Sequence, residues 1–204
     1  MLAQQHTIKK TISMKGVGLH TGVTTTMTFK PAPEDYGIRF RRIDLGGAPE
    51  IPADVDHVID IARGTTLGIG EARVHTTEHV LAAIVGLQID NLIIEINNIE
   101  PPIADGSAKP FVDMLLDAGV QEQQAPKDYL IIDQTIRYQD ETRGIDIVAL
   151  PTDDFRVTVM IDYNNPALGS QHTGLFNLEK EFVNEFCSAR TFCFLHEVEV
   201  LRDQ

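Results

Sequence analysis

Short stretches in which apolar and polar residues alternate, or in which β-branched residues gather, run through the first hundred residues. Such stretches predict β-strands, because side chains in a strand point alternately to its two faces. Glycines and the Lys30-Pro31-Ala32-Pro33 segment separate several of them, as turns do. The strands expected in this part of the chain are residues 7–13, 24–29, 37–42, 63–67, 72–75 and 92–96.

Two segments have the spacing of an amphipathic helix. The first begins at about Thr76 or Thr77, either of which can cap the free amides of the first turn, and it ends at Gly86. Its apolar residues lie three and four positions apart and form one stripe. The second helix is expected over residues 108–118, with Gly119 as its terminator.

A polar stretch containing a proline, residues 121–127, predicts a domain boundary. Beyond it we expect strands, then a loop and a late helix: strands at 129–132, 135–138, 146–150 and 156–162, a loop at 164–174 and a helix at 178–187. This order predicts an α+β fold, since an α/β sheet would alternate strand and helix throughout. We expect two similar domains, residues 1–126 and 127–204, each a mostly antiparallel sheet packed with two helices. The second is expected to be incomplete in this chain.

The formal net charge of −13 over 204 residues argues against nucleic acid as a partner. The apolar runs fall short of the ~20 residues that a bilayer-spanning helix needs. The N-terminus also lacks the charged start and apolar stretch of a secretory signal. We therefore expect a cytoplasmic protein with at most peripheral membrane contact, and these features predict no oligomeric state.

The segment His75-Thr76-Thr77-Glu78-His79 is the densest cluster of catalytic residue types. Imidazoles bind zinc, and a neighbouring carboxylate can accept a proton from a zinc-bound water. The spacing matches the H-x-x-E-H pattern of inverted zinc peptidases, in which both histidines bind zinc from one helix. Here His75 is expected to end a strand before the helix, which leaves His79 as ligand and Glu78 as base. A zinc peptidase and a capped helix with a surface histidine remain the alternatives.

Four segments, spread over nearly the whole chain, carry a resemblance to a known family. They are Gly16-Val17-Gly18-Leu19-His20-Thr21-Gly22, Thr77-Glu78-His79-Val80-Leu81-Ala82-Ala83, Pro102-Ile103-Ala104-Asp105-Gly106-Ser107-Ala108 and Ser188-Ala189-Arg190-Thr191-Phe192. Each is weak alone, but in this order they resemble the UDP-3-O-acyl-N-acetylglucosamine deacetylase family of lipid A biosynthesis. Some relatives carry a fused hydroxyacyl-acyl-carrier-protein dehydratase, which these residues neither indicate nor exclude.

The resemblance implies the chemistry and the residues that perform it. It implies zinc-dependent hydrolysis of the acetamido group of UDP-3-O-acyl-N-acetylglucosamine, the substrate partner. Glu78 matches the general base and His79 a Zn²⁺ ligand. Thr191 matches the threonine that hydrogen-bonds the oxyanion of the tetrahedral intermediate. His75 has no ligand role in that family.

The family's two other zinc ligands lie in a His-Lys-x-x-x-Asp segment, which is expected beyond Gln204. A catalytic zinc site needs three protein ligands and an open position. The 204-residue chain alone is therefore expected to be inactive. A non-catalytic α+β binding module is the alternative for the chain as it stands.

Five residues are candidates for substrate binding. Leu19 and His20 lie in the glycine-rich turn, from which a side chain can reach the site. By resemblance, Phe192 and Phe194 line the passage for the acyl chain, and Tyr163 stacks on uracil. The alternatives are an ordinary turn histidine, core phenylalanines and a tyrosine at a strand end.

Overall fold

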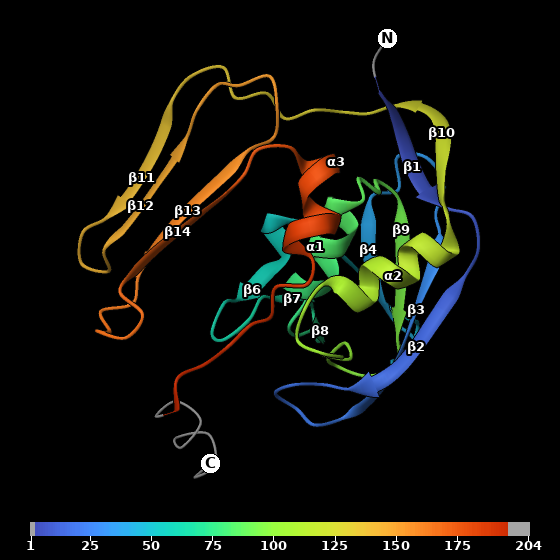
Figure 1. Cartoon of the computed structure of the whole chain (residues 1–204). Helices are drawn as coiled ribbons and strands as arrows, with labels where there is room; N and C mark the ends of the chain where they lie inside the picture. The colour runs from blue at the N-terminus through green and yellow to red at the C-terminus, as the bar shows by residue number, and fades with distance from the viewer. Residues whose placement is uncertain (1–2, 196–204) are drawn as a thin grey trace.

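A five-stranded sheet forms the centre of the first half of the chain (Figure 1). The computed structural model describes residues 3–195. Neighbouring strands of the sheet are antiparallel except for the parallel pair β4–β9. In spatial order the strands are β2 (Ile12–Val17), β3 (Thr24–Pro31), β9 (Leu92–Ile96), β4 (Ile38–Arg42) and β5 (Glu50–Pro52).

Two helices, α1 (Glu78–Gly86) and α2 (Lys109–Ala118), pack against each other and cover this sheet (Figure 1). Their apolar stripes join the alternate residues of the strands in one hydrophobic core. Fully buried core residues come from both layers: Met27, Phe29, Phe40, Leu92, Ile94 and Ile96 from strands, and Val80, Ala83, Phe111 and Leu115 from helices.

Two smaller sheets flank this core. In the first, β7 lies between β6 and β8, and β8 leads directly towards α1. In the second, the N-terminal strand β1 pairs antiparallel with β10. A short 3₁₀ turn, Val55–His57, precedes β6. The bounds are β6 (Val58–Asp60), β7 (Thr66–Ile69), β8 (Ala72–Val74), β1 (Gln4–Ile8) and β10 (Val120–Pro126).

The second half of the chain contains two β-hairpins that lie away from the helices α1 and α2 (Figure 1). The side chains of β13 are exposed on both of its faces. A short helix, α3 (Leu178–Glu181), follows and continues as a π-helical turn, Phe182–Phe186. The hairpin strands are β11 (Ile136–Asp140) with β12 (Ile145–Ala149), and β13 (Val157–Asp162) with β14 (Ser170–Leu175).

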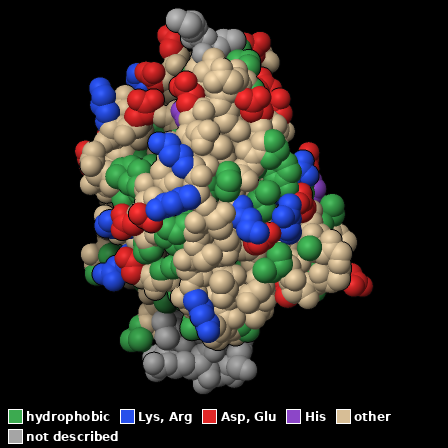
Figure 2. Space-filling model, turned by 90° about the vertical axis from the view of Figure 1, so that its right-hand side faces the viewer, with side chains coloured by type: hydrophobic (Ala, Val, Ile, Leu, Met, Phe, Trp, Pro, Cys, Tyr) green, Lys and Arg blue, Asp and Glu red, His purple; other side chains and the backbone are tan. Residues whose placement is uncertain are grey.

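The surface mixes charges of both signs. On the face shown in Figure 2, Lys and Arg side chains are interspersed with Asp, Glu and hydrophobic ones. Surface ion pairs of the described chain include Lys10 with Asp117 at 3.4 Å and Lys109 with Asp113 at 2.7 Å. Within residues 3–195, no helix has the length and apolar character to cross a bilayer.

The α+β class and the mostly antiparallel pairing are confirmed, with three α-helices in the described part of the chain. The strand expected over residues 7–13 is two strands, because the chain turns at Lys9 and Lys10 between β1 and β2. Residues 121–126 of the stretch that predicts a domain boundary belong to strand β10, whose bounds are Val120–Pro126. Much of β10 is exposed, so its composition is that of a loop.

Two expectations in the second half of the chain are also wrong. Residues 129–132 form no strand, and the loop expected over 164–174 contains most of β14. Since most residues of β14 are exposed, the strand lacks the apolar alternation that marks a half-buried one. The division into two domains at residue 126 remains a prediction.

The segment after β14 is anchored on helix α1 through one glycine. A Cβ at Gly86 would collide with the ring of Phe182, so glycine allows the ring to lie directly on the end of α1. Gln88 also donates a hydrogen bond to Glu179 of α3, at 2.9 Å. Through these two contacts the segment after the hairpins packs on the core, in which Cys187 is buried.

We predict that Gly86→Ala lowers the free energy of unfolding by about 1–3 kcal/mol, the usual cost of overpacking. Alanine is otherwise the better helix residue by about 1 kcal/mol, so a loss would identify the Phe182 ring as its cause. In a Phe182→Ala background the same change should be neutral or stabilising. Denaturant titration of the four proteins measures this cycle, and an equal loss in both backgrounds would contradict the docking contact.

A buried carboxylate, Glu100, ties together segments that are far apart in the sequence. Its side chain is fully buried. Oε2 accepts hydrogen bonds from Thr21 N at 2.9 Å and Thr21 Oγ1 at 2.6 Å, and Oε1 accepts from Thr76 Oγ1 at 2.8 Å. The amide of His20 lies 3.1 Å and 3.2 Å from the two oxygens. Burial raises the pKa of the Glu100 carboxyl, but these hydrogen bonds outweigh it and hold the pKa below its ordinary value.

The lowered pKa predicts how stability depends on pH. Because Glu100 is ionised more easily in the folded state, its stabilising effect is present above the unfolded pKa of about 4.3 and is lost as the pH falls through the folded pKa. Glu100→Gln should therefore cost about 1–3 kcal/mol of unfolding free energy at pH 7, and less at low pH.

Unfolding of wild type and variant at a series of pH values tests this prediction. Glu122→Gln, at an exposed position of β10, is the matched control and should differ little from wild type. A difference between wild type and Glu100→Gln that stays constant down to about pH 3 would contradict the ionised form of Glu100 as the stabilising one.

Candidate active site

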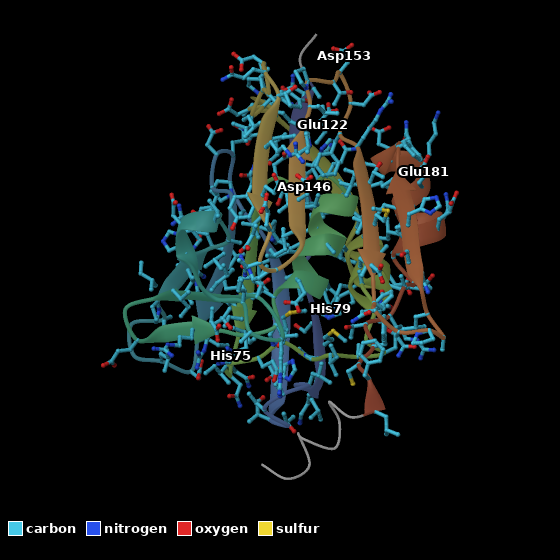
Figure 3. The ribbon with its side chains drawn as sticks, turned by 90° about the vertical axis from the view of Figure 1, so that its left-hand side faces the viewer. His75, His79, Glu122, Asp146, Asp153 and Glu181 are labelled. Carbon is cyan, nitrogen blue, oxygen red and sulfur yellow. The ribbon has the colours of Figure 1, made fainter. Side chains whose placement is uncertain are left out.

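The chain turns sharply between β8 and α1, and this turn places the candidate residues. Thr76 has φ +52°, in the left-handed region, and helix α1 begins at Glu78. Glu78 and His79 are thus the first two residues of the helix, whereas His75 precedes it. In Figure 3, His79 lies on α1 and His75 lies apart from it, after the end of β8. The two histidines therefore do not share a helix face, as an H-x-x-E-H zinc site would require.

The expected capping role of the threonines is wrong. Thr77 occupies the N-cap position, but its side chain makes no cap hydrogen bond. Its backbone is already helical, at φ −80° and ψ −18°, whereas a capping side chain needs an extended backbone. Instead, the Thr77 hydroxyl donates to the Thr65 carbonyl at 3.1 Å, and that of Thr76 donates to Glu100. Both hydroxyls fix the turn.

The carboxylate of Glu78 is held in place by the backbone of the preceding loop. Its Oε2 accepts a hydrogen bond from the Thr65 amide at 2.9 Å. A Cβ at Gly64 would lie 3.2 Å from Oε1, so the loop passes close to the second oxygen as well. The side chain is half-buried. A carboxylate that is anchored at one oxygen and partly open to solvent can accept a proton at a defined place.

The two histidines, His75 and His79, differ in the hydrogen bonds of their rings. The His75 ring is bonded through Nδ1 to the Thr66 hydroxyl at 2.9 Å. The half-buried imidazole of His79 makes no hydrogen bond within residues 3–195, so both of its nitrogens are uncommitted. Of the two, His79 is the ring that is free to bind a ligand next to Glu78.

The described residues do not by themselves fit a zinc ion. A zinc site draws on three or four protein ligands. Among residues 3–195, no group of three or more His, Cys, Asp or Glu side chains is arranged to hold a metal. His79 offers one imidazole, and no reaction step through zinc follows from these residues alone.

The glycine-rich loop borders a pocket beside this turn. His20 Nε2 lies 3.1 Å from the Arg63 carbonyl oxygen, so the ring bridges two loops, while Leu19 is half-exposed. The pocket has a volume of about 340 Å³, and neither Glu78 nor His79 lines it. Its lining residues are His20, Thr21, Asp60, Ala62, Arg63, Gly64, Thr66, His75 and Thr76.

Thr191 lies against the turn at residues 103–107. Its amide donates to the Gly106 carbonyl at 3.0 Å, which brings together two of the segments that carry the family resemblance. The residue is exposed. Its hydrogen bond goes to this turn and not to Glu78 or His79.

The three aromatic candidates for substrate binding are brought together. The ring of Tyr163, at the end of β13, lies 5.6 Å from Phe192 and 6.2 Å from Phe194, and the two phenylalanines are 6.0 Å apart. The contacts of Phe194 with the other two rings are edge-to-face and that between Tyr163 and Phe192 is tilted, and ring pairs at these spacings stabilise an aromatic cluster. Phe192 is 60% exposed, so the cluster is a surface feature and not a core.

Glu100 and Thr65 are residues near the site that sequence reasoning missed. Glu100 directly precedes Pro101-Pro102 and resembles a surface glutamate in the sequence. A signal was available in the glycine-rich loop, because a tight loop exposes amides that need an acceptor. Thr65 acts through its backbone amide, which carries no sequence signal.

Comparison with known proteins shows the family to which the chain is similar. The family model described as "UDP-3-O-acyl N-acetylglycosamine deacetylase" matches residues 5–204. A "Bifunctional enzyme LpxC/FabZ" of Chlorobaculum tepidum is 59% identical over 204 residues, which are 100% of this chain and 44% of that protein. A "UDP-3-O-acyl-N-acetylglucosamine deacetylase" of Teredinibacter turnerae is 42% identical over 205 residues, 100% of this chain and 67% of that protein. One of the same name from Myxococcus xanthus is 41% identical over 198 residues, 97% of this chain and 62% of that protein.

This chain thus spans between about two fifths and two thirds of the length of these relatives. The match covers both the Glu78–His79 turn and the segment that ends with the aromatic cluster. The chain belongs to the UDP-3-O-acyl N-acetylglycosamine deacetylase family.

Proposed function

We propose that the protein hydrolyses the acetamido group of UDP-3-O-acyl-N-acetylglucosamine, a step of lipid A synthesis in the cytoplasm, and that the reaction depends on zinc. The observation that carries the proposal is the start of helix α1. There an anchored carboxylate, Glu78, adjoins an uncommitted imidazole, His79. Membership of the deacetylase family supports the choice of substrate class.

His79 is proposed as one zinc ligand. The remaining ligands would come from the part of the relatives' length that this chain does not span, since the described residues offer no complete set. Zinc bound there would polarise the amide carbonyl and lower the pKa of a bound water towards about 7. The 204-residue chain alone is accordingly proposed to be inactive.

Glu78 is proposed as the general base. The Thr65 amide bonds to Oε2 and thereby fixes the carboxylate, which leaves Oε1 as the oxygen that accepts the proton of the attacking water. By the family resemblance, the leaving amine is proposed to receive its proton from a later histidine, in the part of the relatives' length that this chain does not span.

Thr191 and the aromatic residues are proposed to act on the substrate. The Thr191 hydroxyl would donate to the oxyanion of the tetrahedral intermediate, and the loss of one such donor usually costs about 10²–10³ in rate. Phe192 and Phe194 would contact the acyl chain, and Tyr163 the uracil ring. Their mutual contacts support a shared apolar surface for the ligand.

Leu19 and His20, in the glycine-rich loop, are proposed to border the substrate site. The hydrogen-bond contact between His20 Nε2 and the Arg63 carbonyl supports this placement, since it holds the ring in the lining of the neighbouring pocket. Residues 1–126 and 127–204 are proposed to be two similar α+β domains. The contrast between the buried core of the first part and the exposed hairpins of the second supports a division there.

We predict that Glu78→Gln, made in the full-length protein, lowers the rate of deacetylation by at least about 10²-fold while leaving the bound zinc in place. Glutamine keeps the shape of the side chain and can still accept the Thr65 amide, but it does not accept a proton. Release of acetate from the UDP-linked substrate and elemental analysis of the metal measure the two effects.

Glu122→Gln is the control for this variant and should retain wild-type turnover. Wild-type turnover in Glu78→Gln, with the metal content intact, would show that another residue accepts the proton. Absence of deacetylation in the wild-type protein itself would overturn the proposed function.

A further inference from the structure

The donors to Glu100 all belong to segments that border the candidate active site. They are the amides of His20 and Thr21 and the hydroxyls of Thr21 and Thr76. No other residue in the described chain combines full burial with a carboxylate. A buried charge is tolerated only where hydrogen-bond donors surround it. The carboxylate therefore constrains the position of each donor, and the donors constrain the position of the carboxylate.

On the helix side, Glu100 accepts a hydrogen bond from Thr76, a residue with a strained backbone. A β-branched residue with φ +52° is strained, and such conformations persist only where the surroundings hold them. The bond from Thr76 Oγ1 to Glu100, at 2.8 Å, provides that hold in the buried interior. Two residues later the chain reaches Glu78, so the turn at Thr76 sets the direction in which α1 presents its first side chains.

Two hydrogen bonds with Thr65 connect the turn at Thr76 to Glu78, the candidate base. The Thr77 amide donates to the Thr65 carbonyl at 3.1 Å, and the Thr65 amide donates to Glu78 Oε2 at 2.9 Å. If Thr76 changes conformation, Thr77 and Glu78 cannot both keep their bonds to Thr65. The carboxylate of Glu78 therefore depends on Glu100 although the two side chains do not touch each other.

On the loop side, the approach of Glu100 requires glycine at position 18. A Cβ at Gly18 would collide with Oε2 of Glu100 and would lie 2.8 Å from Thr21 Oγ1. The Gly18 amide is bonded to the Val23 carbonyl at 2.9 Å, which closes the loop around the carboxylate. The ring of His20 is thereby fixed over the Arg63 carbonyl.

We propose that Glu100 is a positioning residue of the deacetylase: through Thr76 it orients the Glu78–His79 start of α1, and through Thr21 it fixes the loop that carries His20. The proposal rests on the proposed function. Glu100 contacts neither substrate nor reacting atoms and acts only through these hydroxyls and amides.

The test is Thr76→Val in the full-length protein, with Thr76→Ser as the rescue. Valine replaces the hydroxyl that bonds Glu100 with a methyl group of similar size, whereas serine keeps a hydroxyl at this position. Thr76→Val should lower kcat by about 10–100-fold, since a misplacement of about 1 Å at a catalytic group can cost 10²-fold. KM should change by less than about threefold, and Thr76→Ser should recover most of the lost kcat.

Thr25→Val is the matched control. Thr25 is also fully buried, but its hydroxyl has no hydrogen-bond partner within the described residues. Its removal should leave kcat and KM at wild-type values. A kcat for Thr76→Val equal to that of Thr25→Val would overturn the proposal, as would a loss that Thr76→Ser does not restore.

Hydrogen exchange of the Thr65 amide separates this inference from the proposed function. The amide should exchange faster in Thr76→Val than in wild type and in Thr76→Ser, whether or not the protein deacetylates the substrate. Unchanged exchange would overturn the positioning role, whereas lack of wild-type turnover would overturn only the function. If Thr76→Val does not fold, Glu100→Gln takes its place: a fall in kcat of at least about fivefold with faster Thr65 exchange supports the role, and unchanged values refute it.

Discussion

The buried carboxylate of Glu100 is the constraint on which the arrangement of the candidate site depends. An ionised group in a protein interior is stable only when hydrogen-bond donors replace its water. Here the donors come from the glycine-rich loop and from the turn before α1. The same carboxylate therefore closes the loop, stabilises the left-handed backbone of Thr76 and links the two parts of the chain that carry His20 and Glu78.

Adjacent residues at the start of a helix can serve two different purposes. Successive side chains point about 100° apart around the axis, because a turn contains 3.6 residues. Glu78 can thus bond to the Thr65 amide while the neighbouring His79 ring stays free. His75 lies before the helix and is bonded to Thr66, so the sequence pattern that suggests a two-histidine site does not produce one.

The elements predicted correctly from the sequence are those with one buried face, because their apolar residues recur at a regular spacing. Strand β9 and helices α1 and α2 were located within about two residues, because each has one face in the core. Strands β10 and β14 were missed because mostly exposed strands show little apolar alternation. The residue types of Glu78 and His79 were enough to predict them as candidate site residues, but the contact between Thr76 and Glu100 joins distant segments and left no signal in the sequence. The contact between Tyr163 and Phe192 also joins distant segments and was not predicted from the sequence.

The central claim is that α1 presents one zinc ligand, His79, next to a base, with His75 uninvolved. The most direct measurement is an anomalous difference map, at the zinc absorption edge, from crystals of the full-length protein. The account predicts a peak about 2.0–2.1 Å from a ring nitrogen of His79 and no peak at His75. A zinc ion held by both histidines, or one bound away from His79, would contradict it.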